Sequence, residues 1–499
     1  MEPQKRRSSA FREIGLEEDF VDEPDRVEKL TKGQRRPQSV RFRSQDEVHV
    51  VDTHPGAKRE REPRATRRPD AISSEDVAPI PAPKPEPTKG GSIMHRLGVT
   101  LFLVAVALPL LRTTGLLDST AALPIQPAEA GVIPPGAASR TGPDLSKRSD
   151  SPTAICFRWA QQSAVVNGTL YLYGGQATTT IGQSENTWNN DFLALDLTKD
   201  WDIAAPALTG LPQPSGPPAV ALGALWNSFD SLFLYGGEFS WKPPVEPTPL
   251  SLWEYEIQSQ SWVEHQNPTT SSGTNAPNNN DAVQRAAEGA TASVPSLGRA
   301  FYFGGHQDGY TTPGWSQSIP RIYLQSLLEF TFPGYANSQV NALSNGQTAG
   351  NNGIYRNITQ GGLQSSAGFT QRADGLLIYI PGFGDQGILL ALAGGTNQTF
   401  TQMNVLDIYD IATSAWYRQS TSGSTPEIRV NPCAVVGAAP DGSSHNIYMF
   451  GGQNLTPYGN QSQFDDLWIL TVPAFTWIRV DQSGQSVPPG RSGHTCNVW

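Results

Sequence analysis

The chain has 499 residues and a net charge of −10, but its composition differs strongly between two parts. Residues 1–96 are about two-fifths charged and contain no Trp or Tyr, whereas the remaining residues hold all 12 Trp and all 14 Tyr and carry a net charge of −12. The first part lacks the apolar side chains of a core, and the acidic second part offers little to phosphates, which argues against a nucleic-acid binder.

The first 92 residues are predicted to be a disordered tail. Basic and acidic clusters alternate in it, and a Pro-rich run at 78–87 follows. Such sequences cannot bury enough apolar surface to fold. The arginine pair before Ser8 and Ser9 suggests a kinase or sorting signal, but we favour a simple solvated tail.

A single apolar run separates the two parts. Residues 97–111 contain no charge, and the apolar stretch continues past Arg112 to Leu117. As a helix, residues 97–117 would measure about 31 Å, which matches the roughly 30 Å hydrocarbon core of a bilayer. We therefore predict a transmembrane signal anchor over 93–117. The alternatives are a buried core helix or a cleaved signal peptide that begins at Met94 and leaves a secreted protein.

Two counts predict the same orientation of this span. Three basic residues, Lys84, Lys89 and Arg96, precede it, and Arg112 is the one basic residue among the next twenty. All five N-glycosylation sequons follow it, at Asn167, Asn357, Asn397, Asn454 and Asn460. We expect a single-pass type II membrane protein with a cytosolic amino-terminal tail and a luminal or extracellular carboxy-terminal part. Residues 118–150, which are rich in proline, are predicted to be a flexible linker.

Residues 151–499 contain an internal repeat. An apolar run ending in a glycine pair occurs five times, at Gly174-Gly175, Gly236-Gly237, Gly304-Gly305, Gly394-Gly395 and Gly451-Gly452. An arginine opens four of these units and a further one near the end of the chain: Arg158, Arg285, Arg372, Arg429 and Arg491. Alternating strand-like segments follow the glycine pairs, and a tryptophan closes four of them: Trp201, Trp262, Trp416 and Trp477. This pattern predicts a four-stranded unit.

The arginine, glycine pair and tryptophan in this order resemble the kelch repeat, whose units are the blades of a β-propeller. The segments ICFRWAQQSAVVNGTLYLYGG and TWNNDFLALDLT also look like a group of fungal membrane-anchored kelch proteins of no settled activity. The resemblance implies an all-β propeller over 151–499 with five recognisable blades and the start of a sixth.

Two units depart from this pattern. The third lacks a clear tryptophan, for which Phe330 or Phe332 is expected to substitute, and an insertion near 331–371 is expected to lengthen it. The sixth begins at Arg491 and has no glycine pair before Trp499, so we expect either an incomplete chain or a partner that supplies the rest of that blade.

Three cysteines fall in the second part, at Cys156, Cys433 and Cys496. Cys433 and Cys496 occupy nearly equivalent positions four and five residues after an arginine. We favour buried, unbonded side chains over a Cys433–Cys496 bridge. Their spacing does not suggest a metal site, because no C-x-x-C or clustered His accompanies them.

An enzymatic function is the less favoured interpretation. Galactose oxidase is similar in its use of kelch-like blades around a copper site with His and Tyr ligands. Here His265, His306, His445 and His494 are scattered over different units, and no nucleophile elbow or phosphate loop is found. We predict no catalytic residue, cofactor or metal site, with a copper-dependent oxidase as the alternative.

We predict instead a binding scaffold for a protein or glycan partner. The loops after the first three glycine pairs contain aromatic residues among neutral polar ones: Trp188, Trp241, Tyr310 and Trp315. These loops and those with Asn397, Asn454 and Asn460 should emerge on one face, whereas Asn167 lies in a hairpin turn on the other. Glycans would then cover the fourth and fifth units and leave the first three free.

Overall fold

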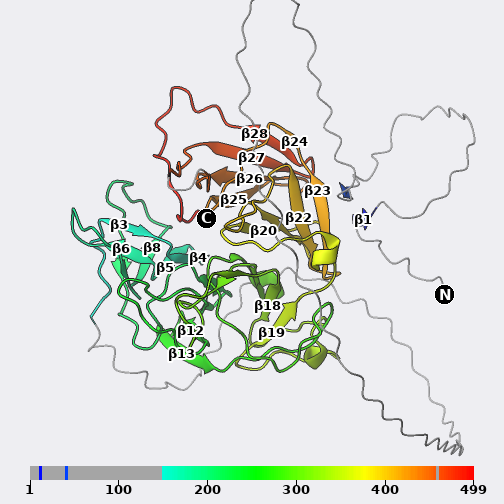
Figure 1. The fold of residues 1–499 in the computed structure, drawn as a ribbon, viewed down its shortest axis with the longest axis horizontal. Coiled ribbons are helices and arrows are strands. Elements are labelled where there is room, and N and C mark those ends of the chain that lie inside the picture. The colour runs from blue at the N-terminus through cyan, green and yellow to red at the C-terminus, as the bar shows by residue number, and fades with distance from the viewer. Residues whose placement is uncertain (1–10, 14–39, 43–148, 457–459, 499) are drawn as a thin grey trace, which may run out of the picture. The chain divides into compact units, whose positions relative to one another are not determined.

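The structure is a computed structural model, and it describes residues 11–13, 40–42, 149–456 and 460–498 (Figure 1). Strands β1 (Phe11–Glu13) and β2 (Val40–Phe42) pair in parallel. The rest of the predicted tail, the predicted span 93–117 and nearly all of the linker lie outside the described residues. Within the described residues, no helix is long and apolar enough to cross a membrane.

Residues 149–498 form an all-β structure whose main units are five antiparallel sheets in chain order (Figure 1). The first sheet contains β4 (Gln162–Val166), β5 (Thr169–Tyr173), β8 (Phe192–Asp196) and β9 (Thr209–Gly210), and the second contains β10 (Ala224–Asn227), β11 (Ser231–Tyr235), β12 (Ser251–Glu256) and β13 (Ser261–Gln266). The third sheet contains β14 (Ala290–Val294), β15 (Arg299–Phe303), β18 (Leu327–Thr331) and β19 (Ile354–Ile358), and the fourth contains β20 (Leu376–Ile380), β21 (Ile388–Leu392), β22 (Val405–Asp410) and β23 (Ala415–Ser420). The fifth sheet contains β25 (Cys433–Ala438), β26 (His445–Phe450), β27 (Leu467–Val472) and β28 (Thr476–Arg479).

Shorter elements join these sheets. A fifth strand, β24 (Ser422–Gly423), pairs in parallel with β28. The others are β3 (Phe157–Trp159), β6 (Gln176–Thr178), β7 (Thr187–Trp188), β16 (His306–Gln307) and β17 (Ile322–Tyr323), with the 3₁₀ helices η3 (Pro295–Leu297), η4 (Asn341–Leu343) and η5 (Ser365–Ala367).

Each sheet packs face to face on the next through aromatic and aliphatic side chains. Separate apolar clusters fill the junctions between the first and second, second and third, third and fourth, and fourth and fifth sheets. At the junction between the second and third sheets, the Trp226 ring stacks on the Tyr235 and Phe330 rings with centroid distances of 4.9 and 5.8 Å. The period-2 alternation of each strand produces this layering, because one face of the strand meets each neighbouring sheet.

The sheets are arranged around a closed ring of backbone hydrogen bonds. The residue just before each inner strand donates its N–H to the carbonyl oxygen of the equivalent residue in the preceding unit, at N–O distances of 2.7–3.3 Å. The ring members are Ala160, Leu222, Glu288, Asp374, Asn431 and Gly493, and all six have a positive φ of 52–64°. The sixth unit therefore completes the ring through Gly493.

The glycine pairs lie where the second strand of each sheet ends. In the first, second, third and fifth sheets both glycines have a positive φ, and the second glycine donates its N–H to the next unit. In the fourth sheet Ala393 and Gly394 take these two positions, and Gly395 follows them. The predicted pair Gly394-Gly395 is thus displaced by one residue, because Ala393 adopts the left-handed backbone that glycine adopts elsewhere.

The closing aromatic residue stands second in the outermost strand. Trp262, Trp416 and Trp477 lie there as predicted, and Tyr355 takes the equivalent place in β19. Phe330 lies opposite Tyr355 on the neighbouring strand, so the prediction that Phe330 or Phe332 substitutes for the tryptophan is wrong.

Trp201 does not match this pattern either. It lies in the loop between β8 and β9 with 41% of its surface exposed, because the outer strand of the first sheet is only two residues long.

The opening arginines bind their own sheets in three cases. Arg158 and Arg429 each donate to the carbonyl oxygen of their unit's first paired glycine and to an aspartate, Asp191 and Asp466 respectively. Arg372 binds Asp407.

Arg285 differs from the other opening arginines. It donates to Gly236 in the preceding sheet at 2.9 Å and lies over the Phe239 ring, because it stands one residue earlier than its counterparts.

The insertion in the third unit is shorter than predicted. The loop between β18 and β19 covers 332–353 and has its own small core of Val340, Leu343 and Ala349. A buried ion pair between Arg356 and Glu329 lies beside it, and Gln339 of the loop accepts a hydrogen bond from Arg356 at 2.8 Å. Asn357 belongs to β19 rather than to the inserted loop.

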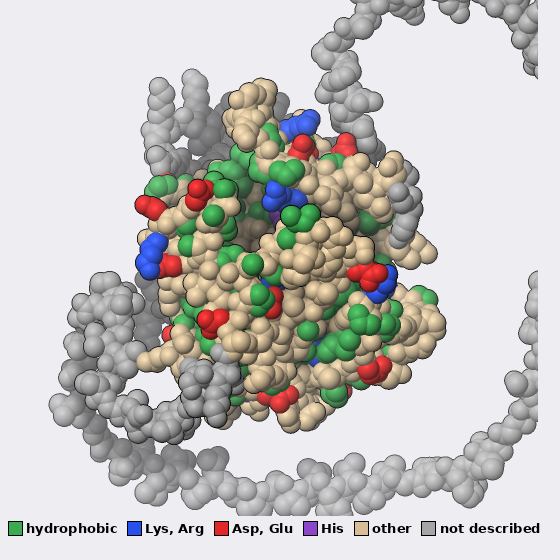
Figure 2. Space-filling model, turned by 90° about the vertical axis from the view of Figure 1, so that its left-hand side faces the viewer, with side chains coloured by type: hydrophobic (Ala, Val, Ile, Leu, Met, Phe, Trp, Pro, Cys, Tyr) green, Lys and Arg blue, Asp and Glu red, His purple; other side chains and the backbone are tan. Residues whose placement is uncertain are grey.

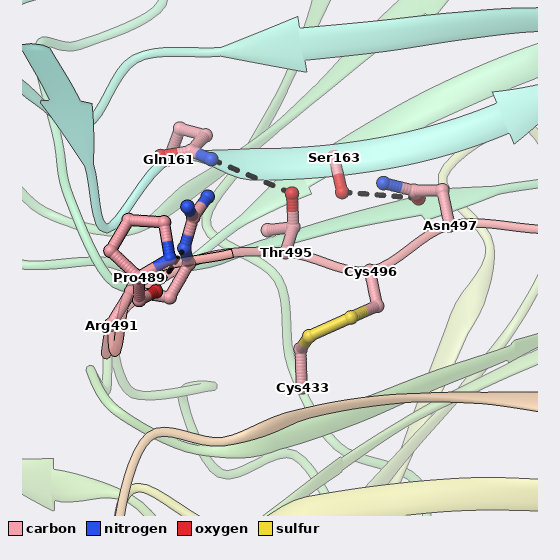
Figure 3. Close-up of a disulfide and its surroundings, with 8 residues drawn as sticks. All are labelled: Gln161, Ser163, Cys433, Pro489, Arg491, Thr495, Cys496 and Asn497. Atoms are coloured by element: carbon pink, nitrogen blue, oxygen red, sulfur yellow. Dashed lines mark hydrogen bonds between the residues drawn. A yellow bond between two sulfur atoms is a disulfide. The ribbon is translucent and has the colours of Figure 1, made fainter. Parts of the chain in front are cut away.

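The segment 493–498 runs between the fifth and first sheets, and a disulfide holds it (Figure 3). Cys433 in β25 is bonded to Cys496, with a Cα–Cα distance of 5.3 Å, so our preference for unbonded cysteines is wrong. On the other side, Gln161 and Ser163 donate to Thr495 and Asn497 at 3.5 and 3.3 Å. Cys156 is free and exposed.

Candidate binding site

The predicted aromatic loops meet on one side of the sheets, where the second strands end. We call this side the loop face. The Trp188 and Trp241 rings pack edge to face with a centroid distance of 5.3 Å. The Phe239 N–H donates to the Tyr310 carbonyl oxygen at 2.9 Å, and the Gly314 N–H donates to Glu246 at 2.8 Å. The loops of the first three sheets therefore form one continuous group.

An apolar groove of about 330 Å³ lies between the first and second of these loops. Its side walls are formed by Trp188, Phe239, Pro218, Pro243 and Val245. Trp241 stands at its edge with 47% of its surface exposed. Lys242 supplies the one charged side chain of the lining, and it pairs with Glu185 at 2.7 Å. The groove can take an apolar side chain or a flat ring.

A buried charged cluster lies at the base of these loops, and no sequence motif indicated it. His306 directly follows the third glycine pair, and its two ring nitrogens face Glu288 at 2.9 Å and Asp308 at 3.2 Å. Burial alone would lower the pKa of His306, but the two carboxylates raise it to about 9. His306 is therefore held as an imidazolium at neutral pH.

Two further residues complete this cluster. Arg321 donates to both carboxylate oxygens of Glu288 at 2.8 Å. Glu238 is 2% exposed, and its Oε2 has no hydrogen bond, with Arg321 3.8 Å away. Burial, and after it the charge of Glu288, raises the pKa of Glu238 to about 8, so this carboxyl is neutral at pH 7.

The cluster fixes the positions of the aromatic loops. Glu238 directly precedes Phe239, and Asp308 accepts the N–H of Tyr310 at 2.8 Å. The Asp308 N–H in turn donates to Thr311 at 2.8 Å. Because Glu288, His306 and Asp308 are buried and paired with one another, they hold the bases of these loops in fixed positions.

A small polar cavity of about 120 Å³ lies beside the backbone ring. Gln161, Glu288, Asp374, Asn431 and His494 contribute to its lining. Burial and the nearby Arg491 lower the pKa of His494 to about 4, so its ring is neutral at physiological pH. The side-chain oxygen of Gln161 has no hydrogen-bond partner within the described structure.

The comparisons with known proteins agree with this architecture. Residues 385–499 match the family model described as the KLHDC2/KLHL20/DRC7 Kelch-repeats domain. Over 356 residues the chain is 64% identical to a Kelch repeat-containing protein of Arthroderma benhamiae. This chain is a kelch-repeat protein. The match covers 71% of the chain and 53% of the relative, so the kelch-repeat chain spans about half the length of that relative.

The four histidines of the kelch part lie apart in the fold. His265 is in β13 and binds Glu254 at 2.8 Å, and His445 begins β26. His306 is in the charged cluster and His494 is at the cavity. Among the described residues, one group of three potential metal ligands is found, and it consists of Cys433, His494 and Cys496. Sequence spacing did not predict this group, because the two cysteines are 63 residues apart.

The sequons fall where their units predict, with one exception. Asn397 and Asn460 are exposed in loops of the loop face, and Asn454 is half-buried there. Asn167 lies in the β4–β5 turn on the opposite face with a φ of 50°. Asn357 is half-buried in β19 and lines a cavity of about 570 Å³.

Proposed function

We propose that this kelch-repeat protein is a β-propeller that acts as a membrane-anchored binding scaffold, with its ligand site on the loop face of the first three sheets. The apolar groove beside Trp188 and the exposed Trp241 supports this proposal most directly. An apolar groove with an aromatic side chain at its edge is typical of surfaces that bind an apolar group of a partner.

The lining of the groove favours a peptide segment of a protein partner over a sugar. Two prolines, a valine, a phenylalanine and a tryptophan provide apolar contacts. The face in the space-filling view consists mostly of backbone and uncharged side chains, and its charged side chains are scattered (Figure 2). Grooves of this kind bind extended peptides through one or two apolar side chains.

A glycan ligand is the second candidate, and a different cavity favours it. The cavity of about 570 Å³ lies between the second and third sheets. Its lining consists mainly of amide groups, such as those of Asn278, Asn280 and Gln307, of hydroxyl groups, and of two tyrosine rings, one of which is Tyr302. Neutral hydrogen-bonding groups beside aromatic rings suit sugar hydroxyls.

The proposal includes type II topology, with the propeller luminal or extracellular. The cytosolic tail, the span 93–117 and the sequons at Asn167, Asn357, Asn397, Asn454 and Asn460 support it. Glycans at Asn397, Asn454 and Asn460 would shield the fourth and fifth sheets, so a partner could bind only to the first three sheets. A secreted form and a copper oxidase are the alternatives. Peptide-mapped, glycosidase-sensitive mass shifts test the topology, and the absence of any glycan would count against it.

The ligand site is tested with a random peptide display library and a glycan array, each probed with the full chain. Peptides that bind the unsubstituted protein should no longer bind the Trp241→Ala variant. Trp201→Ala is the matched control, because Trp201 is similarly exposed but lies in a β8–β9 loop on the opposite face. Peptide binding that survives Trp241→Ala would refute the groove as the site. Loss with Gln307→Ala and not with Trp241→Ala would favour the glycan candidate.

A further inference from the structure

The residues that close the ring between the fifth and first sheets have the composition of a metal site. The sulfur atoms of Cys433 and Cys496 and a ring nitrogen of His494 lie within 4.8 Å of one another. Cys433 comes from β25, and His494 and Cys496 come from the segment that completes the ring. Two thiolates and one imidazole are a donor set that Zn²⁺ binds tightly.

The third donor is available for this role. The backbone of Phe450 forms a hydrogen bond with the His494 ring, which leaves one ring nitrogen for a metal ion. The ring packs edge to face on Phe450 with a centroid distance of 5.8 Å, which holds it near the two sulfurs. A histidine that binds a metal through one ring nitrogen usually donates its other ring N–H to a backbone carbonyl or a carboxylate, so the contact with the Phe450 backbone suits this role.

The surroundings leave space for a fourth ligand. His494 and Thr495 line the cavity of about 120 Å³ beside the ring. A zinc ion with three protein ligands retains one position for water or another small ligand. The cavity adjoins His494 and has room for that water.

We propose that Cys433 and Cys496 form a reversible thiol–disulfide pair whose reduced form binds one Zn²⁺ together with His494. Two thiol groups of a reductant break the S–S bond. The reductant thiols become a disulfide, and their two electrons and two protons pass to the cysteine sulfurs. Zn²⁺ then displaces these two protons and binds both thiolates. The junction between the fifth and first sheets is thus closed either by a covalent bond or by a metal ion.

The test uses the full chain with Cys156→Ser, which removes the one free thiol. The protein is reduced with dithiothreitol, freed of reductant without oxygen, and titrated with Co²⁺ and then with Zn²⁺. We expect one equivalent of Co²⁺ to give an intense thiolate-to-cobalt absorption band, and Zn²⁺ to abolish it. The oxidised protein should give no such band.

His494→Ala should weaken metal binding by at least about 10-fold, because loss of a ligand costs no less than loss of an outer-shell partner. His445→Gln is the matched control, since His445 lies in the same sheet as Cys433 but outside the group of Cys433, His494 and Cys496. This substitution should leave the affinity for the metal ion unchanged.

Two results would overturn the proposal: a reduced protein that gives no cobalt band, or equal affinity with and without His494. Circular dichroism of the reduced protein provides an independent reading. If the reduced protein unfolds and Zn²⁺ restores the fold, the proposal is supported. If it stays unfolded with Zn²⁺ present, the proposal is wrong.

Discussion

The four junctions between consecutive sheets differ in kind from the junction between the fifth sheet and the first. Each of the four contains a continuous apolar cluster contributed by both neighbouring sheets. At the closing junction, the segment 493–498 is held by a disulfide, by Gly493 in the backbone ring and by two long side-chain hydrogen bonds.

This difference shows that ring closure and core formation are separate requirements. Apolar burial stabilises the consecutive junctions in proportion to area, so their stability is spread over many side chains. The closing junction relies on a few specific bonds, because the segment 493–498, which lies there, forms no strand in the described structure. Substitutions should therefore affect the two kinds of junction differently.

The largest expected effect concerns Trp226, which lies fully buried between the second and third sheets and donates to Thr291 at 2.7 Å. Trp226→Ala should lower the free energy of unfolding by about 3–5 kcal/mol, through lost apolar contact and the cavity left behind. Urea denaturation followed by circular dichroism measures this loss. A loss under about 1 kcal/mol would show that the consecutive junctions are not held by their cores.

His306 provides a pH-dependent contribution at the consecutive junctions. Its pKa is raised from 6.5 to about 9, so the stabilisation is fully present below pH 6.5 and is lost as pH rises to about 9. This shift corresponds to about 3 kcal/mol at most. Glu238, with its pKa raised to about 8, acts in the same direction.

We therefore expect stability to fall between pH 6.5 and 9, and His306→Gln to flatten that fall while lowering stability at pH 6. His445→Gln serves as the comparison, since the pKa of His445 is lowered by burial rather than raised. An equal slope in both variants would contradict the assignment. Urea denaturation at a series of pH values provides the measurement.

The disulfide should matter most at the closing junction. In non-reducing buffer, the double substitution Cys433→Ser and Cys496→Ser should cost about 2–4 kcal/mol, because it frees a 63-residue loop in the unfolded chain. Limited proteolysis should then cut first within 489–498. Cleavage elsewhere at the same rate would show that the disulfide does not hold this segment.

The smallest effect concerns Gly493, whose φ is 64°. Gly493→Ala should cost about 1 kcal/mol, since a Cβ in the left-handed region is disfavoured and would lie 3.2 Å from the Trp159 ring. Gly442→Ala is a close control, with a φ of 65° and open space around it. The difference between the two melting temperatures isolates the contact with Trp159, and identical values would exclude any effect of that contact.

The sequence predicted the repeated four-stranded units well, because strand alternation and glycine pairs are local signals. It was less reliable where two residue types can fill one position. Ala393 adopts a backbone conformation that marks glycine in the other units, and Tyr355 replaces a tryptophan. Periodicity alone cannot tell such substitutes from their neighbours.

Contacts between distant units could not be predicted in this way. His306 and Glu288 belong to one unit, but Glu238 reaches them from the preceding one. The group of Cys433, His494 and Cys496 likewise depends on ring closure. The aromatic loops are an exception, since their equivalent positions after the glycine pairs placed them on one face, as expected.

The backbone ring also determines the electrostatic character of the centre of the molecule. Its six peptide groups point head to tail around a circle, so their dipoles cancel instead of adding as they do along a helix. The ring therefore favours neither anions nor cations. The charge near this centre therefore comes from side chains: His306 and Arg321 lower the pKa of Glu288 in spite of its burial, whereas burial and the charge of Glu288 raise the pKa of Asp374 well above its usual range.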